Sequence, residues 1–229
     1  MSSVPWFETP LMNAVQRDLA GWPSEKLSER SALLRLNDAT AVTFSVRQKR
    51  LFMASIHSCE FVVEGPVTRP ARGKIRAHQS GWLKCLPIRF IGSKESAELA
   101  GYLNGFPNLQ QTLSELDYRR FSLTFDDSGW RCCIEPWAAS EVVCKMPPLR
   151  RYLRLEAQQR MLLLSVLAMI NQAVSQWMRG ENRRRESIDF PAITAGKLRW
   201  FIADQTAAPA DRWPRAGTAQ MRRAAAAAE

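Results

Sequence analysis

The sequence is poor in the residues that metal sites and common catalytic motifs require. Its 229 residues include only two histidines, His57 and His78, which lie far apart in the chain. A zinc or iron site needs three or four convergent ligands, so no metal is expected. The motifs G-x-S-x-G, G-x-x-x-x-G-K-[ST] and G-x-G-x-x-G are absent, and the 11 glycines are scattered. These absences argue against common hydrolase and nucleotide-binding sites, and no cofactor is expected.

The cysteines form no C-x-x-C pair and are odd in number: Cys59, Cys85, Cys132, Cys133 and Cys144. This pattern predicts a reducing compartment rather than a disulfide framework. The first ten residues, MSSVPWFETP, have neither a basic nor an apolar stretch typical of a signal peptide. We therefore expect a cytoplasmic protein. His57 and Cys59 would share a face of a strand, but without a third orienting group ordinary packing is the preferred interpretation.

The basic excess is concentrated in one part of the chain. The net charge is +10, of which residues 145–229 carry +8. Arginine outnumbers lysine 25 to 7, and the guanidinium group favours planar oxyanions because it donates two parallel hydrogen bonds. No window of 18 uncharged apolar residues is present, so no ordinary membrane-spanning helix is expected.

Hydrophobic periodicity predicts an α+β fold, with an antiparallel sheet covered by helices and a long C-terminal helix. Helices are predicted at 9–21, 93–104, 108–115 and 155–178. Strands are predicted at 41–46, 51–63, 74–78, 82–91, 121–125, 130–134 and 141–146, with a turn or an exposed strand end at 47–50. Segment 26–36 is ambiguous. The element order resembles that of secretion-chaperone-like folds, as in type III secretion, but those chaperones are usually acidic and this chain is basic.

A single domain followed by an extension is expected. Residues 1–179 are predicted to form the α+β domain, and residues 180–229 a basic C-terminal extension that is partly a mobile tail. A candidate surface-binding cluster in this extension comprises Arg183, Arg184, Arg185 and Trp200. These residues suit an anionic membrane or single-stranded nucleic acid. The alternative is a linker whose apolar residues dock back on the domain.

A second basic cluster follows the pair Pro147–Pro148 and comprises Arg150, Arg151 and Arg154. The pattern places it at the start of the long helix, where cations oppose the helix dipole. Either acidic side chains neutralise these arginines, or they face an anion outside the chain. The internal ion pair is preferred, with Glu141 as the first partner to test.

The segments SEVV (140–143) and MPPLRRYLRL (146–155) resemble an uncharacterised proteobacterial family, domain of unknown function 3156, over about residues 10–178. Relatives carry a Gly-Gly pair where this chain has Ala138–Ala139. The resemblance implies a bacterial protein and implies no activity.

Three functional interpretations stay open. The first is a non-enzymatic cytoplasmic adaptor that binds a protein partner or a second copy of itself. The second is binding of nucleic acid or anionic lipid through the basic C-terminal third. The third is a small-ligand carrier or an enzyme with an unrecognised pocket.

Overall fold

The computed structural model describes residues 9–79 and 88–180. Backbone proximity divides the chain into two units, 1–190 and 191–229, and all described residues belong to the first. The elements are α1 (Pro10–Asp18), β1 (Ser24–Ser28), β2 (Ser31–Asn37), β3 (Thr40–Arg50), β4 (Ala54–Gly65), β5 (Gly73–His78), β6 (Arg89–Gly92), η1 (Lys94–Ser96), α2 (Ala97–Leu103), α3 (Pro107–Glu115), β7 (Tyr118–Asp126), β8 (Gly129–Pro136), β9 (Ser140–Cys144), β10 (Leu149–Leu153) and α4 (Ala157–Met178).

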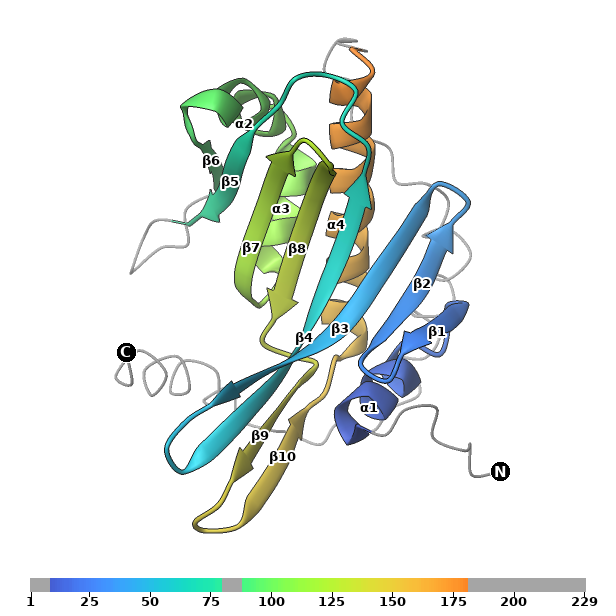
Figure 1. Cartoon of the computed structure of the whole chain (residues 1–229), viewed down its shortest axis with the longest axis vertical. Helices are drawn as coiled ribbons and strands as arrows, with labels where there is room; N and C mark the ends of the chain where they lie inside the picture. Colours follow the sequence, from blue (N-terminus) through green and yellow to red (C-terminus); the bar gives the residue numbers. More distant parts are fainter. Residues whose placement is uncertain (1–8, 80–87, 181–229) are drawn as a thin grey trace, which may run out of the picture. The chain divides into compact units, whose positions relative to one another are not determined.

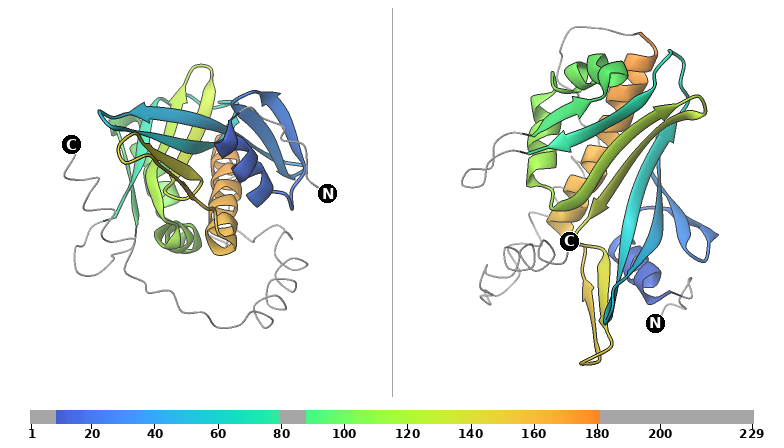
Figure 2. Two further views of the ribbon diagram at one scale, coloured as in Figure 1. Left: turned by 90° about the horizontal axis from the view of Figure 1, so that it is seen from below. Right: turned by 60° about the vertical axis from the view of Figure 1, so that its left-hand side comes forward.

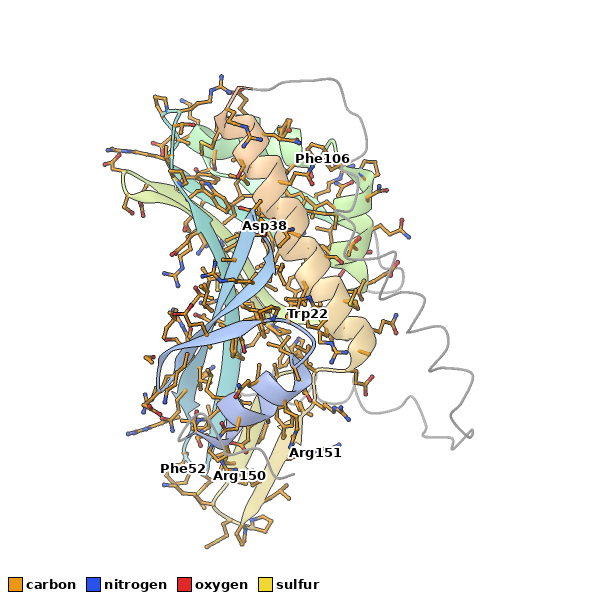
Figure 3. All side chains as sticks on the ribbon, turned by 90° about the vertical axis from the view of Figure 1, so that its right-hand side faces the viewer. Trp22, Asp38, Phe52, Phe106, Arg150 and Arg151 are labelled. Atoms are coloured by element: carbon orange, nitrogen blue, oxygen red, sulfur yellow. The ribbon has the colours of Figure 1, made fainter. Side chains whose placement is uncertain are left out.

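The strands form one antiparallel sheet with the helices packed on one side of it (Figures 1 and 2). The main path runs β1-β2-β3-β4-β8-β7-β5-β6, and β9 and β10 branch from β4. The predicted α+β class is therefore correct. The other face of the sheet carries none of the described helices, as the edge-on view shows (Figure 3).

The core lies between the sheet and α4. Strands β3 and β4 alternate, so that Phe44 and Phe61 both point toward the helices and stack with ring centroids 5.9 Å apart. Trp130 on β8 is the bulkiest side chain that is fully buried among the described residues. Its ring occupies the space left open by Gly65 on the paired strand β4.

Helix α4 is apolar on most sides because the sheet and α3 cover it. By length and a mean hydropathy of 1.4 it could cross a membrane, but 61% of that window is buried within the protein, as in a core helix. Its C-terminal carbonyls are satisfied from the loop after β4. Thr68 Oγ1 donates to Met178 O at 2.7 Å, and Arg69 Nη1 donates to Trp177 O at 3.1 Å.

The structure decides three of the predicted segments. Residues 47–50 are the exposed end of β3, the second of their two interpretations, and the turn comes at 51–53, where apolar residues resemble a continuing strand. Segment 149–153 is strand β10 rather than the approach to a helix, so α4 begins only at Ala157. The ambiguous segment 26–36 belongs to the hairpin of β1 and β2.

Strand β4 pairs with two different strands along the same edge. Its second half, from Phe61 to Gly65, pairs with β8, whereas its first half, from Ala54 to Ser58, pairs with β9. The chain passes from β8 to β9 at Ala139, whose φ of 54° makes the corner. The result is a four-stranded projection of β3, β4, β9 and β10 beyond the helix layer, seen at the bottom of Figure 1. We call residues 47–58 and 140–153 the arm.

Candidate functional site

The tip of the arm consists of two adjacent turns, 51–53 between β3 and β4 and 145–148 between β9 and β10. A backbone hydrogen bond from Lys145 N to Met53 O, 2.8 Å long, ties one turn to the other. The first turn is closed by Leu51 N, which donates to Ala54 O at 2.8 Å. The two turns therefore form one structural unit.

This tip carries most of the large apolar side chains that the described part of the chain exposes. Phe52 is 94% exposed and Met146 is 75% exposed. The full set at the tip is Leu51, Phe52, Met53, Met146 and Leu149. Only Leu27 and Ile91 join them elsewhere among the described residues. A cluster of this kind is a candidate interaction surface, because scattered single apolar residues are the usual pattern on a protein surface.

Cations surround the tip on both faces of the arm. The strand registers give one row across the arm on the open face: Lys49, Ile56, Val142 and Arg151. The next row toward the tip lies on the helix-side face: Arg50, Ser55, Val143 and Arg150. In both rows the outer strands β3 and β10 supply the cations. The arm contains six Lys or Arg residues and one Glu, a formal charge of +5.

Most of this charge is not neutralised by carboxylates of the described residues. Among described residues, no carboxylate lies within ion-pair distance of the four exposed cations Lys49, Arg50, Lys145 and Arg151. Arg150 differs, because its Nε and Nη2 donate to the two oxygens of Glu141 at 2.5 and 2.9 Å. The hydrogen bond to Glu141 raises the pKa of Arg150. Figure 3 shows Phe52, Arg150 and Arg151 together at this end of the ribbon.

The structure separates the arginines that the sequence grouped together. Arg150 and Arg151 lie on β10, not at a helix start, and only Arg150 contacts Glu141. Arg154 instead pairs with Asp18, at 3.2 Å from Nε to Oδ1. The tail cluster Arg183, Arg184, Arg185 and Trp200 lies outside the described residues.

Asp18 connects the base of the arm, at the end of β10, to helices α1 and α4. Its side chain is fully buried at the end of α1 and accepts hydrogen bonds from Tyr152 Oη at 2.7 Å and from Leu155 N at 3.1 Å. Burial, followed by the bond to this carboxylate, raises the pKa of Tyr152. Arg160 donates to the carbonyl oxygen of Asp18 and lies 5.5 Å from the ring centroid of Trp22. These contacts fix α1, β10 and α4 to one another.

The open face of the sheet carries a cross-strand ion-pair ladder. Glu60, with a side chain only 2% exposed, contacts Arg47 at 2.5 Å and also Arg120. Arg120 continues to Glu135 at 3.7 Å, and Arg119 contacts the same carboxylate at 3.4 Å. Since these arginines already have carboxylate partners, this ladder is a poorer anion site than the unpaired cations near the tip of the arm.

Glu60→Gln should lower the free energy of unfolding by about 1–2 kcal/mol, because the ion pairs of a buried carboxylate with Arg47 and Arg120 are lost. Arg47→Gln should cost under about 1 kcal/mol, since Arg47 is 61% exposed and screened by solvent. Urea denaturation of both variants measures the two values. Equal costs would contradict the assignment of Glu60 as the centre of the ladder.

The other chemical candidates in the described residues are structural. Burial raises the pKa of Cys133 to about 11 and raises the pKa of Cys59 and Cys132 as well, so these thiols are poor nucleophiles. His57 Nε2 lies 3.3 Å from Ser55 Oγ. No group of His, Cys, Asp and Glu within 9–79 and 88–180 is arranged to hold a metal ion.

An open hollow of about 630 Å³ lies beside loop 67–72. Arg72 in its wall is paired, because its Nη2 contacts Asp127 Oδ2 at 2.5 Å. The hydrogen bond that Arg72 donates to Asp127 raises the pKa of Arg72. Arg69, the other arginine of this wall, donates to Trp177 O, so both guanidinium groups already have partners.

Sequence reasoning missed both Phe52 and Asp18. Phe52 falls in the predicted strand 51–63, although LFM follows directly on RQKR, and a polar run before an apolar one is a weak sign of an exposed turn. Asp18 had a clearer signal. It lies on the apolar stripe of α1, seven residues after Leu11 and three after Val15, where an acid needs buried partners.

Comparison with known proteins agrees with the resemblance noted in the sequence. Neither the comparison with curated proteins nor that with solved structures found a match. A family model described as Protein of unknown function (DUF3156) matches residues 17–174, a span that includes α4 almost to its end and the whole arm. Because this match covers more than half of the chain, the protein belongs to the DUF3156 family.

Proposed function

We propose that this protein is a non-enzymatic binding module that attaches to an anionic surface through its arm. The observation that carries the proposal is the set of exposed arm cations with no carboxylate partner among the described residues, Lys49, Arg50, Lys145 and Arg151. Two of them come from the N-terminal half of the chain and two from the C-terminal third, and the sheet brings them together. Unpaired cations gathered at one end attract an anionic partner and steer its approach.

The scaffold supports this role. The Asp18 contacts hold the base of β10, and the long strands β3 and β4 run without a break from the core to the tip. A rigid base matters because ordering a flexible segment on binding would weaken the affinity. The adaptor interpretation was based on the apolar surface of α4, but none of the large apolar side chains exposed among the described residues belongs to that helix.

Neutralising the arm should weaken binding to a polyanion. The variant K49Q/R50Q/K145Q/R151Q should elute from a heparin column at clearly lower salt than the native full-length chain, and its salt dependence should be shallower. The reason is that fewer counterions are released when fewer cations bind. The matched control is K74Q/R76Q/R89Q/K94Q, which removes four exposed cations from β5, β6 and η1 at the opposite end of the sheet.

Two outcomes would count against the proposal. If both quadruple variants elute at the same reduced salt, retention reflects only net charge. If the tail variant R183Q/R184Q/R185Q loses retention while the arm variant keeps it, the basic extension rather than the arm is the anion site. Circular dichroism of each variant checks that the fold is intact.

A further inference from the structure

We infer that the anionic surface is a lipid bilayer, and that the apolar tip of the arm enters it while the surrounding cations contact the headgroups. This inference rests on the proposed function and names its partner. It explains the one feature that charge alone does not explain, namely that the most exposed side chains at the tip are apolar. Phe52 is 94% exposed and Met146 is 75% exposed, so both are in contact with water in the free protein.

The spacing of charge and apolar groups along the arm matches the layers of a membrane surface. Arg50 and Lys49 precede the first turn by one and two residues, which is about 3–7 Å at about 3.3 Å per strand residue. The headgroup layer of one leaflet is about 5–8 Å thick. When the tip reaches the acyl-chain boundary, the cations are therefore level with the lipid phosphates, where each favours binding to anionic lipid.

The placement of the cations on both faces also favours a bilayer approached end-on. Lys49 and Arg151 face the open side of the sheet, whereas Arg50 and Arg150 face the helix side. A planar surface that receives the tip contacts both faces equally. A nucleic acid lying along one face of the arm would leave the other row unused. Phe52 is moreover the one aromatic residue of the tip. Its other apolar side chains are aliphatic or thioether groups, which do not stack on bases.

The test uses the full-length chain and vesicles of phosphatidylcholine with or without phosphatidylserine. Native protein should float with the anionic vesicles and stay behind with the neutral ones. The variant F52S/M146S should lower partitioning by about tenfold or more, because two apolar side chains no longer leave water. Both residues are exposed, so the fold should not depend on them.

The matched control is L27S/I91S. It removes the two exposed large apolar side chains of the described region that lie outside the arm, one on β1 and one on β6, each 53% exposed. It should partition as the native chain does. An equal loss in this control would overturn the inference, because binding would then follow total apolar surface rather than the tip.

A depth measurement separates insertion from adsorption. In F52W, the added tryptophan fluorescence relative to the native chain should be quenched by lipids that carry bromine on the acyl chain. If the arm cations are needed for vesicle binding but F52W is not quenched and F52S/M146S binds normally, the inference that the tip enters the bilayer falls and the proposed function stands. If native protein ignores anionic vesicles yet binds a DNA oligonucleotide through the arm cations, the partner is nucleic acid. If neither surface is bound, the proposed function falls as well.

Discussion

Trp130→Ala should lower the free energy of unfolding by about 4 kcal/mol, the usual cost of a cavity left by a large aromatic ring in a closed core. Trp130 is 1% exposed and pairs with Gly65 across the β4–β8 ladder. For a domain of this size the melting temperature should fall by about 10 °C. Urea and thermal denaturation, followed by circular dichroism, measure both values.

Gly65 provides the internal control for this prediction. A Cβ added at Gly65 would lie 2.7 Å from Nε1 of Trp130, which is too close for any contact. Gly65→Ala should therefore destabilise the native chain but cost much less, or even stabilise, when Trp130 is already alanine. Such a reversal in a double-mutant cycle identifies a direct steric pair. Additive effects of the two substitutions would show that the ring does not fill the space above Gly65.

Asp18→Ala should lower the free energy of unfolding by about 3 kcal/mol, because the Tyr152 hydroxyl and the Leu155 amide both lose their acceptor. The Arg154 contact adds little, since Arg154 is 73% exposed. Asp18→Asn keeps one carbonyl oxygen and should cost roughly a third as much. Denaturant unfolding of the two variants tests the order.

Tyr152→Phe distinguishes a specific network from general damage to α1. Alone it should cost about 1 kcal/mol, but in the Asp18→Ala chain it should cost nearly nothing, because the hydroxyl already lacks its acceptor. Hydrogen exchange should show faster amide exchange in β10 of Asp18→Ala, while exchange in β7 and β8 stays slow. Uniformly faster exchange across the sheet would contradict the assignment of Asp18 to the base of the arm.

The sequence was sufficient for the parts of the fold in which pattern and packing agree. Strands β7 and β8 alternate cleanly about the turn at 126–129, and the apolar length of α4 identifies it as a core helix. The α+β class follows from these elements. What could not be predicted is how β4 divides its edge between β8 and β9, because strand pairing between distant segments leaves no local pattern.

The errors concentrate at the arm. Residues 51–53 look like strand interior because they are apolar, and 149–153 look like a helix start because arginine and leucine are good helix formers. Apolar side chains in an exposed turn break the rule that turns are polar. Disagreement between local pattern and structure is expected where a segment serves contact with a partner rather than folding.

The direction of β4 gives the described domain two opposite ends. This strand starts at the tip and ends, after 12 residues and about 40 Å, near the loop that holds the last turn of α4. The chain therefore continues beyond Gly180 from the end opposite the arm (Figure 1). A protein bound through its arm, as proposed above, would hold Gly180 at the end of the described domain that faces away from the bound surface.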